Sequence, residues 1–216
     1  MHGYISDVDL RDFEFLPNFN IKNVLKLFPK KTEHICELGK FNEGTNKYEN
    51  DPCILYERSA YGGDKEWVSQ GETSQYKYPL VHATLKDGAK FFYSNTKDKG
   101  FFGIPKVIFG DGGINEPFID IEGKYGMTQH AIGLVIKDMK DANKLKIFLQ
   151  SNFFRNILAA CMWSTFGIDW RLFTYFKRNF WDIDVNLDEA IIHSEKDEPA
   201  EGGGKQRRFT RKVRRV

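Results

Sequence analysis

The middle of the chain alternates short β-favouring segments with turn signals. β-Branched and aromatic residues fill six segments, and Asp-Gly or Gly-rich turns separate them. The clearest hairpin is LKDGAKFFY, residues 85–93, with Asp87 and Gly88 at its turn. The six predicted strands are residues 53–59, 78–85, 89–95, 105–112, 118–123 and 127–138.

Helical periodicity flanks this region on both sides. Near the N-terminus, apolar residues from Ile21 to Phe28 recur at helical spacing, and Pro29 ends that short helix. Three further apolar stripes predict helices after residue 138, the third with Asp169 as its N-cap and the first with Asp141 near its start. The stripes are Met139, Ala142, Leu145, Phe148; Phe153, Ile157, Leu158, Cys161, Met162; and Trp170, Phe173, Phe176.

The order of these elements predicts an α+β fold. A mixed or antiparallel sheet occupies the N-terminal and middle part, and the C-terminal helices pack on it. Residues 39–52 are polar and rich in Gly and Asn, which predicts a loop. The chain contains 19 Phe among its 216 residues, enough for an aromatic core with some rings left to stack on bases or sugars.

Charge divides the chain into a globular part and a tail. Residues 182–201 carry eight acids against one Lys, and the last twelve residues carry seven Lys or Arg and no acid. Removing those seven from the net charge of +2 leaves −5 for residues 1–204. We therefore predict one globular domain over residues 1–181 and an acidic, then basic, disordered tail over residues 182–216. The basic end suits phosphate backbones, through Arg207, Arg208 and Arg211.

Three cysteines, Cys36, Cys53 and Cys161, lack the spacing of a zinc site. Their odd number, without a disulfide framework, predicts reduced thiols in a reducing compartment. No apolar run reaches the length of a membrane span, so no membrane partner is expected.

Known cofactor loops are absent from the sequence. FGDGGINEP, residues 109–117, is glycine-rich and follows a strand, but Pro117 and the segment FIDI follow it instead of a helix. The chain has no GxxxxGK[ST], no GxSxG and no N/D-P-P-Y/F tetrapeptide. We therefore expect no cofactor.

Asp120, Glu122 and Lys124 allow one catalytic alternative. Carboxylates two residues apart on a strand share a face, and together with a lysine they could bind Mg²⁺ and activate water for phosphodiester cleavage. The competing interpretation is a charged, solvated turn, because EGKYG has good turn chemistry.

Two longer stretches carry a family resemblance. They are GIPKVIFGDGGINEPFIDIEGKYGMTQHAIGLVI, residues 103–136, and LKIFLQSNFFRNILAACMWSTFGIDWRLFTYFKRNF, residues 145–180. The chain resembles the target-recognition region of restriction-modification DNA adenine methyltransferases, in the TaqI-like, type IIG and type I specificity-subunit style. Within that group it looks like a viral member. The match covers roughly residues 100–181, and none of its motifs is catalytic.

The resemblance implies a double-stranded DNA-binding module without catalysis of its own. It also implies a catalytic methyltransferase or nuclease subunit as a partner, and an intracellular location in the cytoplasm or nucleus of a host cell or in a viral factory. Its expected contacts combine phosphate binding, ring stacking and base-edge reading. These residues are Lys106, Lys124, Tyr125, Thr128, Gln129 and His130, with Arg58, Tyr61, Lys65 and Trp67 as a second contact loop. The alternatives are the Mg²⁺-dependent nuclease and a protein-interaction scaffold.

Overall fold

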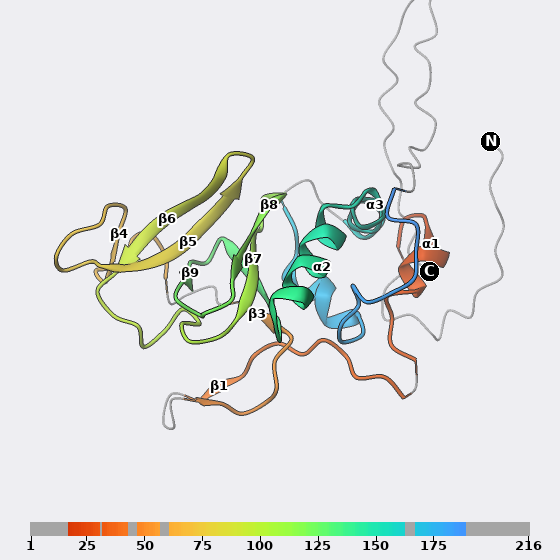
Figure 1. Cartoon of the computed structure of the whole chain (residues 1–216), viewed down its shortest axis with the longest axis horizontal. Helices are drawn as coiled ribbons and strands as arrows, with labels where there is room; N and C mark the ends of the chain where they lie inside the picture. The colour runs from red at the N-terminus through yellow and green to blue at the C-terminus, as the bar shows by residue number, and fades with distance from the viewer. Residues whose placement is uncertain (1–16, 31, 43–46, 57–60, 163–166, 189–216) are drawn as a thin grey trace, which may run out of the picture.

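The computed structural model describes residues 17–30, 32–42, 47–56, 61–162 and 167–188. Their fold is α+β, as predicted: helices cover one side of a middle sheet, and a second sheet covers the other (Figure 1). The described elements are α1 (Ile21–Leu25), β1 (Phe41–Asn42), β2 (Lys47–Tyr48), β3 (Ile54–Leu55), β4 (Val68–Ser69), β5 (Tyr78–Leu85), β6 (Gly88–Ser94), β7 (Lys106–Gly110), β8 (Gly113–Asp120), β9 (Gly126–Met127), β10 (Ala131–Val135), α2 (Met139–Gln150), α3 (Asn152–Cys161) and the 3₁₀ helix η2 (Trp170–Tyr175).

The middle sheet has the order β3-β10-β7-β8, and all its neighbouring strands are antiparallel. Successive side chains point to opposite faces, so Val107 and Phe109 enter the core beneath the helices while Ile108 packs toward the second sheet. Both faces are therefore buried. This explains why β7 and β10 are nearly continuous apolar runs and show little alternation.

The outer sheet has the order β4-β6-β5-β9, with β9 parallel to β5. The predicted hairpin is confirmed, and its two turn residues are Lys86 and Asp87 because Leu85 pairs with Gly88. Gly88 has a φ of +121°, a conformation that only glycine adopts without strain. A β-bulge interrupts β5 between Val81 and Ala83.

Several predicted strand limits were wrong. The strand predicted at residues 118–123 begins earlier, at Gly113, and Pro117 is tolerated because β8 is an edge strand. The strand predicted at residues 127–138 is divided into β9 and β10 by residues 128–130. The loop predicted at residues 39–52 contains the two-residue strands β1 and β2.

The three C-terminal stripes all form helices. Asp169 caps η2 as predicted, its Oδ1 accepting a hydrogen bond from Arg171 N at 3.0 Å. The N-cap of α2 is Asp138, whose Oδ1 accepts from Asp141 N at 2.8 Å. Five rings, with centroids 5.1–6.5 Å apart where they meet, form the centre of the helical core: Phe148, Phe154, Phe173, Phe176 and Phe180.

Packing continues past the domain limit predicted at Trp181. Ile183, Val185 and Leu187 are partly buried against the helical core. Leu187 O accepts a hydrogen bond from Phe153 N at 3.2 Å. The rest of the predicted tail, residues 189–216, lies outside the described residues. Among the described residues, no helix is both long and apolar enough to cross a bilayer.

The expectation of three reduced thiols was wrong. Cys36 and Cys53 form a disulfide across 17 residues, and it joins the segment after α1 to the start of β3. Both cysteines are buried. The sequence showed no framework because one bridge between distant cysteines has no characteristic spacing. Cys161 is a buried free thiol, and its burial raises its pKa to about 12.

We expect reduction of this disulfide to lower the free energy of unfolding by about 2–4 kcal/mol, because the cross-link restricts the unfolded chain. Urea unfolding with and without dithiothreitol measures the difference. The Cys36→Ser/Cys53→Ser variant should not respond to the reductant, whereas Cys161→Ala should respond like the wild type. Three free thiols in the unfolded, unreduced protein would contradict the expectation.

Candidate nucleic-acid interface

Lys106 is fully buried and cannot reach a phosphate, so its predicted role in DNA binding was wrong. Its Nζ lies 2.8 Å from Oδ2 of Asp120, which faces it across the β7–β8 hairpin. The same ammonium lies within 3.0 Å of the carbonyl oxygens of Phe101, Ile104 and Tyr125. Burial lowers the pKa of Lys106, and Asp120 opposes that shift. This buried ion pair fastens the loops at one end of the middle sheet.

Asp120 is likewise committed to structure. Its Oδ1 accepts a hydrogen bond from Lys124 N at 2.8 Å, and its Oδ2 accepts from Tyr125 N at 3.0 Å. The carboxylate therefore organises the turn with both oxygens and has little capacity for Mg²⁺. No group of three or more His, Cys, Asp or Glu in the described part of the chain is arranged to hold a metal ion.

The other two members of the nuclease alternative are on the surface. Glu122 and Lys124 form an exposed ion pair on the turn, and Glu122 raises the pKa of Lys124. Lys124 is 68% exposed, and its predicted contact with a DNA phosphate stays a prediction. The three residues do not form one catalytic cluster, because Asp120 points inward to Lys106.

Thr128 lies below the surface, and Tyr125 lies partly below it. The Tyr125 ring packs edge-on to Phe118 with centroids 4.7 Å apart, and it also contacts Phe91. Thr128 is buried, and its Oγ1 lies 3.1 Å from Nδ1 of His82. The predicted contact of the buried Thr128 with DNA was therefore wrong, whereas that of the half-buried Tyr125 stays a prediction.

His130 and Gln129 are presented at the surface between β9 and β10. Nδ1 of His130, which is 50% exposed, lies 3.3 Å from Oδ2 of Asp111 at the β7–β8 turn. Nε2 of His130 lies 3.3 Å from Nε2 of Gln129. His130 N also donates weakly to Thr128 Oγ1, at 3.4 Å. Three contacts therefore hold the exposed loop: the His130 imidazole to Asp111, the His130 N–H to Thr128, and the Thr128 hydroxyl to His82.

His82 forms the floor beneath this loop. It occupies the bulge in β5, and its ring stacks on Phe92 with centroids 3.9 Å apart and an angle of 6°. His130 meets it edge-on at 5.3 Å. A cavity of about 340 Å³ opens here, between the β5 bulge and the β7–β8 turn. One ring nitrogen of His82 is satisfied by Thr128, and the bulge at which the ring is partly exposed has no sequence signal.

The second predicted contact loop is only partly available. Tyr61 is buried against Leu80 and Phe92, so its predicted contact with DNA was wrong. Lys65 lies 6.0 Å from the centroid of Trp67. A Cβ atom added to Gly62 would lie 3.5 Å from Oε1 of Gln129, so residues 61–67 adjoin the 128–130 loop. Arg58, Arg207, Arg208 and Arg211 lie outside the described residues.

The His82 ring gives this site a defined pH response. Burial lowers the pKa of His82, and His130 and Lys90 lower it further, while Asp111 opposes them. A pKa below that of the unfolded chain means that the fold favours the neutral ring. Its contribution to stability is present above the unfolded pKa of about 6.5 and is lost as the pH falls through the folded value.

We therefore expect the wild type to lose more stability between pH 7 and pH 5 than the His82→Gln variant, which keeps a polar group for Thr128. Urea unfolding at several pH values measures both slopes. His34→Gln, at an exposed position, is the matched control and should keep the wild-type slope. Equal slopes for wild type and His82→Gln would contradict the expectation.

The fold and this site define an α+β module with a hydrogen-bonded, polar surface loop above the rings of His82 and Phe92. No family model, curated protein or solved structure matches this chain.

Proposed function

We propose that the chain is a double-stranded DNA-binding module of the target-recognition kind, without catalysis of its own. The observation that carries this proposal is the presentation of Gln129 and His130 on one braced, exposed loop. A glutamine amide can make paired hydrogen bonds to adenine in the major groove, and an imidazole can bond to several base edges. A braced loop loses little conformational entropy when it binds.

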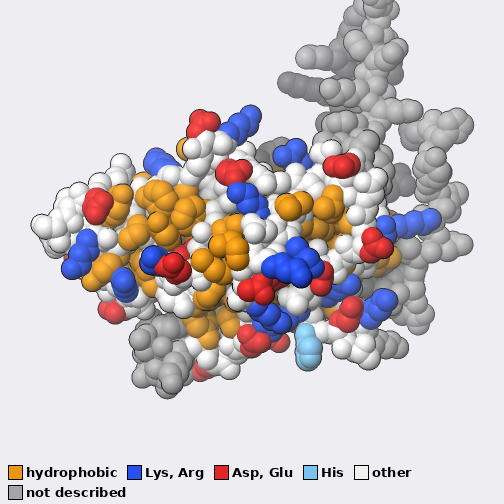
Figure 2. Space-filling view, viewed as in Figure 1, with side chains coloured by type: hydrophobic (Ala, Val, Ile, Leu, Met, Phe, Trp, Pro, Cys, Tyr) orange, Lys and Arg blue, Asp and Glu red, His pale blue; other side chains and the backbone are white. Residues whose placement is uncertain are grey.

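Cations and rings on the outer sheet support the same proposal. Residues 77–99 contain five Lys and two Asp, a local excess of three positive charges. Lys90 lies 5.6 Å from the Phe92 centroid, next to the His82 ring. Lys side chains, with Asp and Glu among them, border the hydrophobic surface over β4, β5 and β6 (Figure 2). Such lysines suit backbone phosphates, which supply affinity and register but no sequence information.

The two alternatives have less support. Cleavage with Mg²⁺ would require Asp120 to leave Lys106 and two backbone N–H groups. The scaffold alternative shares one feature with the proposal, because Met139 and Ile147 leave apolar side chains exposed on α2. Within the proposal, this helix is the surface for a catalytic methyltransferase or nuclease subunit.

An intracellular location belongs to the proposal, since the module must meet its DNA. The Cys36–Cys53 disulfide counts against a reducing compartment. Thiol labelling of the protein in cell extracts made under acid quench tests this point directly. The redox state of Cys36 and Cys53 in the cell is tested separately from DNA binding. A disulfide found in the cell therefore does not by itself reject DNA binding.

Selection from a random duplex pool by the full chain, at two salt concentrations, tests the proposed function. We expect enrichment of one short motif. Gln129→Ala and His130→Ala should each weaken binding to that motif by about 1–3 kcal/mol and relax the preference at single positions. Lys90→Ala and Lys124→Ala should weaken binding to all sequences and reduce the salt slope by about one.

Matched controls separate reading from general charge. Asn143→Ala removes an exposed amide on α2, and His34→Ala removes an exposed imidazole far along the chain from the loop. Both should keep the wild-type motif and affinity. Failure of the wild type to enrich any motif, even at low salt, would reject the recognition function. Enrichment that survives Gln129→Ala and His130→Ala unchanged would reject this loop as the reader.

A further inference from the structure

One chain of hydrogen bonds joins the His82 ring to the backbone of the 128–130 loop. Thr128 Oγ1 accepts from His130 N at 3.4 Å and lies 3.1 Å from Nδ1 of His82. Thr128 is buried, and its hydroxyl makes no other hydrogen bond within the described part of the chain. The backbone is anchored separately, because Thr128 N donates to Val81 O at 3.1 Å. The hydroxyl therefore couples the ring to His130, while the bond to Val81 keeps the loop attached to β5.

A neutral His82 ring satisfies this chain in one direction. A hydroxyl has one proton to donate and two lone pairs with which to accept. While the Thr128 hydroxyl accepts from His130 N–H, it can give its own proton to Nδ1 of His82, and the ring then carries its proton on Nε2. Each donor of the chain has an acceptor, which a buried hydroxyl requires.

Protonation of His82 reverses the last bond of this chain. Both nitrogens of an imidazolium are donors, so Nδ1 must then donate to Thr128 Oγ1. The hydroxyl proton loses its acceptor at a residue that is 2% exposed, which is unfavourable. Rotation of the Thr128 side chain would relieve this cost, but it would move Oγ1 away from His130 N–H. The loop therefore has different hydrogen bonds in the two protonation states of His82.

The charged groups around His82 favour the neutral ring. Lys90 faces it from β6, and His130 meets it edge-on with centroids 5.3 Å apart. Asp111, the one acid that acts on it among the described residues, already pairs with Nδ1 of His130 at 3.3 Å. Burial, His130 and Lys90 lower the pKa of His82, and Asp111 opposes them. A charge on His82 would therefore add repulsion beside His130.

We propose that His82 positions the 128–130 loop through Thr128, so that the loop reads DNA only while the His82 ring is neutral. This inference rests on the proposed function, because it assigns regulation by pH to the same Gln129 and His130 contacts. His82 acts through Thr128 and is therefore a positioning residue. Its protonation lowers the fraction of chains with a competent loop, and the apparent affinity for the recognised motif falls in proportion.

Acid titration of the ¹⁵N-labelled full chain, without DNA, tests the coupling by NMR. The ring nitrogen signals should place the proton of neutral His82 on Nε2. The two imidazoles give separate midpoints, and the amide signals of Gln129 and His130 should show a step at each. His82→Gln and Thr128→Val interrupt the chain at different atoms, and each should leave only the step that belongs to His130. Thr128→Ser restores the hydroxyl and should restore both steps.

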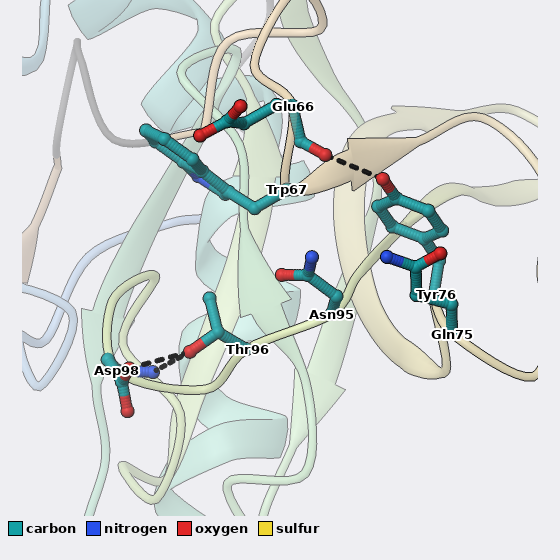
Figure 3. A pocket seen from close by; sticks show the side chains of 7 residues that line it. All are labelled: Glu66, Trp67, Gln75, Tyr76, Asn95, Thr96 and Asp98. Carbon is teal, nitrogen blue, oxygen red and sulfur yellow. Dashed lines mark hydrogen bonds between the residues drawn. The ribbon is translucent and has the colours of Figure 1, made fainter.

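Thr96 provides the matched control, at the hollow beside β4 (Figure 3). Its hydroxyl also accepts from a backbone N–H, that of Asp98 at 3.2 Å, and donates to a titratable group, Oδ2 of Asp98 at 2.8 Å. Thr96→Val should leave both steps of the loop signals unchanged. A neutral His82 with its proton on Nδ1 would overturn the proposal. Absence of the His82 step in the wild type, or its persistence in Thr128→Val, would also overturn it.

Binding to the selected motif tests the consequence for recognition. The ratio of affinities for the motif and for a scrambled duplex removes the general attraction of a protonated imidazole to phosphates. In the wild type this ratio should fall about twofold at the His82 midpoint and about tenfold one pH unit lower, as the competent fraction falls. His82→Gln should lose this component and keep only a change at the His130 midpoint.

The two measurements separate this inference from the proposed function. A ratio that does not fall across the His82 midpoint would overturn the positioning role and leave the proposed function intact. Failure to enrich any motif would reject the proposed function, whereas the titration without DNA would still show whether His82 sets the hydrogen bonds of the loop.

Discussion

Replacing Asp120 by asparagine is expected to lower the free energy of unfolding by about 3–5 kcal/mol, the cost of leaving a buried charge without its partner. Lys106 is 0% exposed, and Asp120 is the one acid bonded to its ammonium among the described residues. The single amide oxygen can accept from only one of the two turn N–H groups, and the neutral side chain cannot balance the lysine. Urea unfolding at neutral pH gives the difference.

Two companion variants make this measurement specific to the buried pair. Glu122→Gln removes the exposed acid of the same turn and should leave stability nearly unchanged, because solvent screens that pair. Lys106→Met together with Asp120→Leu removes both charges but also leaves three carbonyl and two N–H groups without partners, so it should be at least as destabilising as Asp120→Asn alone. An Asp120→Asn variant as stable as Glu122→Gln would show that the pair does not organise this end of the sheet.

Replacing Phe154 by alanine should cost a similar amount, about 3–5 kcal/mol, through the cavity that it leaves. The Phe154 ring is fully buried in the centre of the helical core. Its centroid lies 5.1 Å from that of Phe148 and 6.0 Å from that of Phe180. Neighbouring rings of this size cannot collapse far enough to refill the space.

Phe19→Ala is the matched control, because that ring is 38% exposed. It should change stability much less than Phe154→Ala, and Phe154→Leu should lie between them since it leaves a smaller cavity. Equal effects of Phe154→Ala and Phe19→Ala would mean that the five-ring cluster does not carry the core. Thermal and urea unfolding of all three variants decide the order.

Much of the fold could be predicted because its signals are local. The Asp-Gly turn near residue 87, the helical stripes after residue 138 and the Asp169 cap depend on neighbours a few residues away. The limits of β8 and the division into β9 and β10 depend instead on partner strands. Pairing with a distant strand decides where such an element ends, and a single sequence does not display it.

The candidate site divides in the same way. Gln129, His130 and Lys124 could be identified because polar residues in a turn are usually exposed. Lys106 could not be recognised as buried, because its partner Asp120 lies across a hairpin whose register shifts between Ile108 and Gly110. The same limit applies to His82, since the bulge that turns its ring outward belongs to the pairing of β5 with β6.

The position of β10 in the middle sheet has a consequence for how the chain assembles. β10 lies between β3 and β7, and Leu134 pairs with Ile54, which precedes it by 80 residues. During synthesis β3 therefore emerges long before its neighbour β10, and the sheet forms only when β10 pairs with both β3 and β7. Such long-range pairing slows folding, because the conformational entropy of the long loop is lost before the new contacts offset it. A chain that ends before residue 131 would leave the facing edges of β3 and β7 unpaired, and unpaired strand edges promote aggregation.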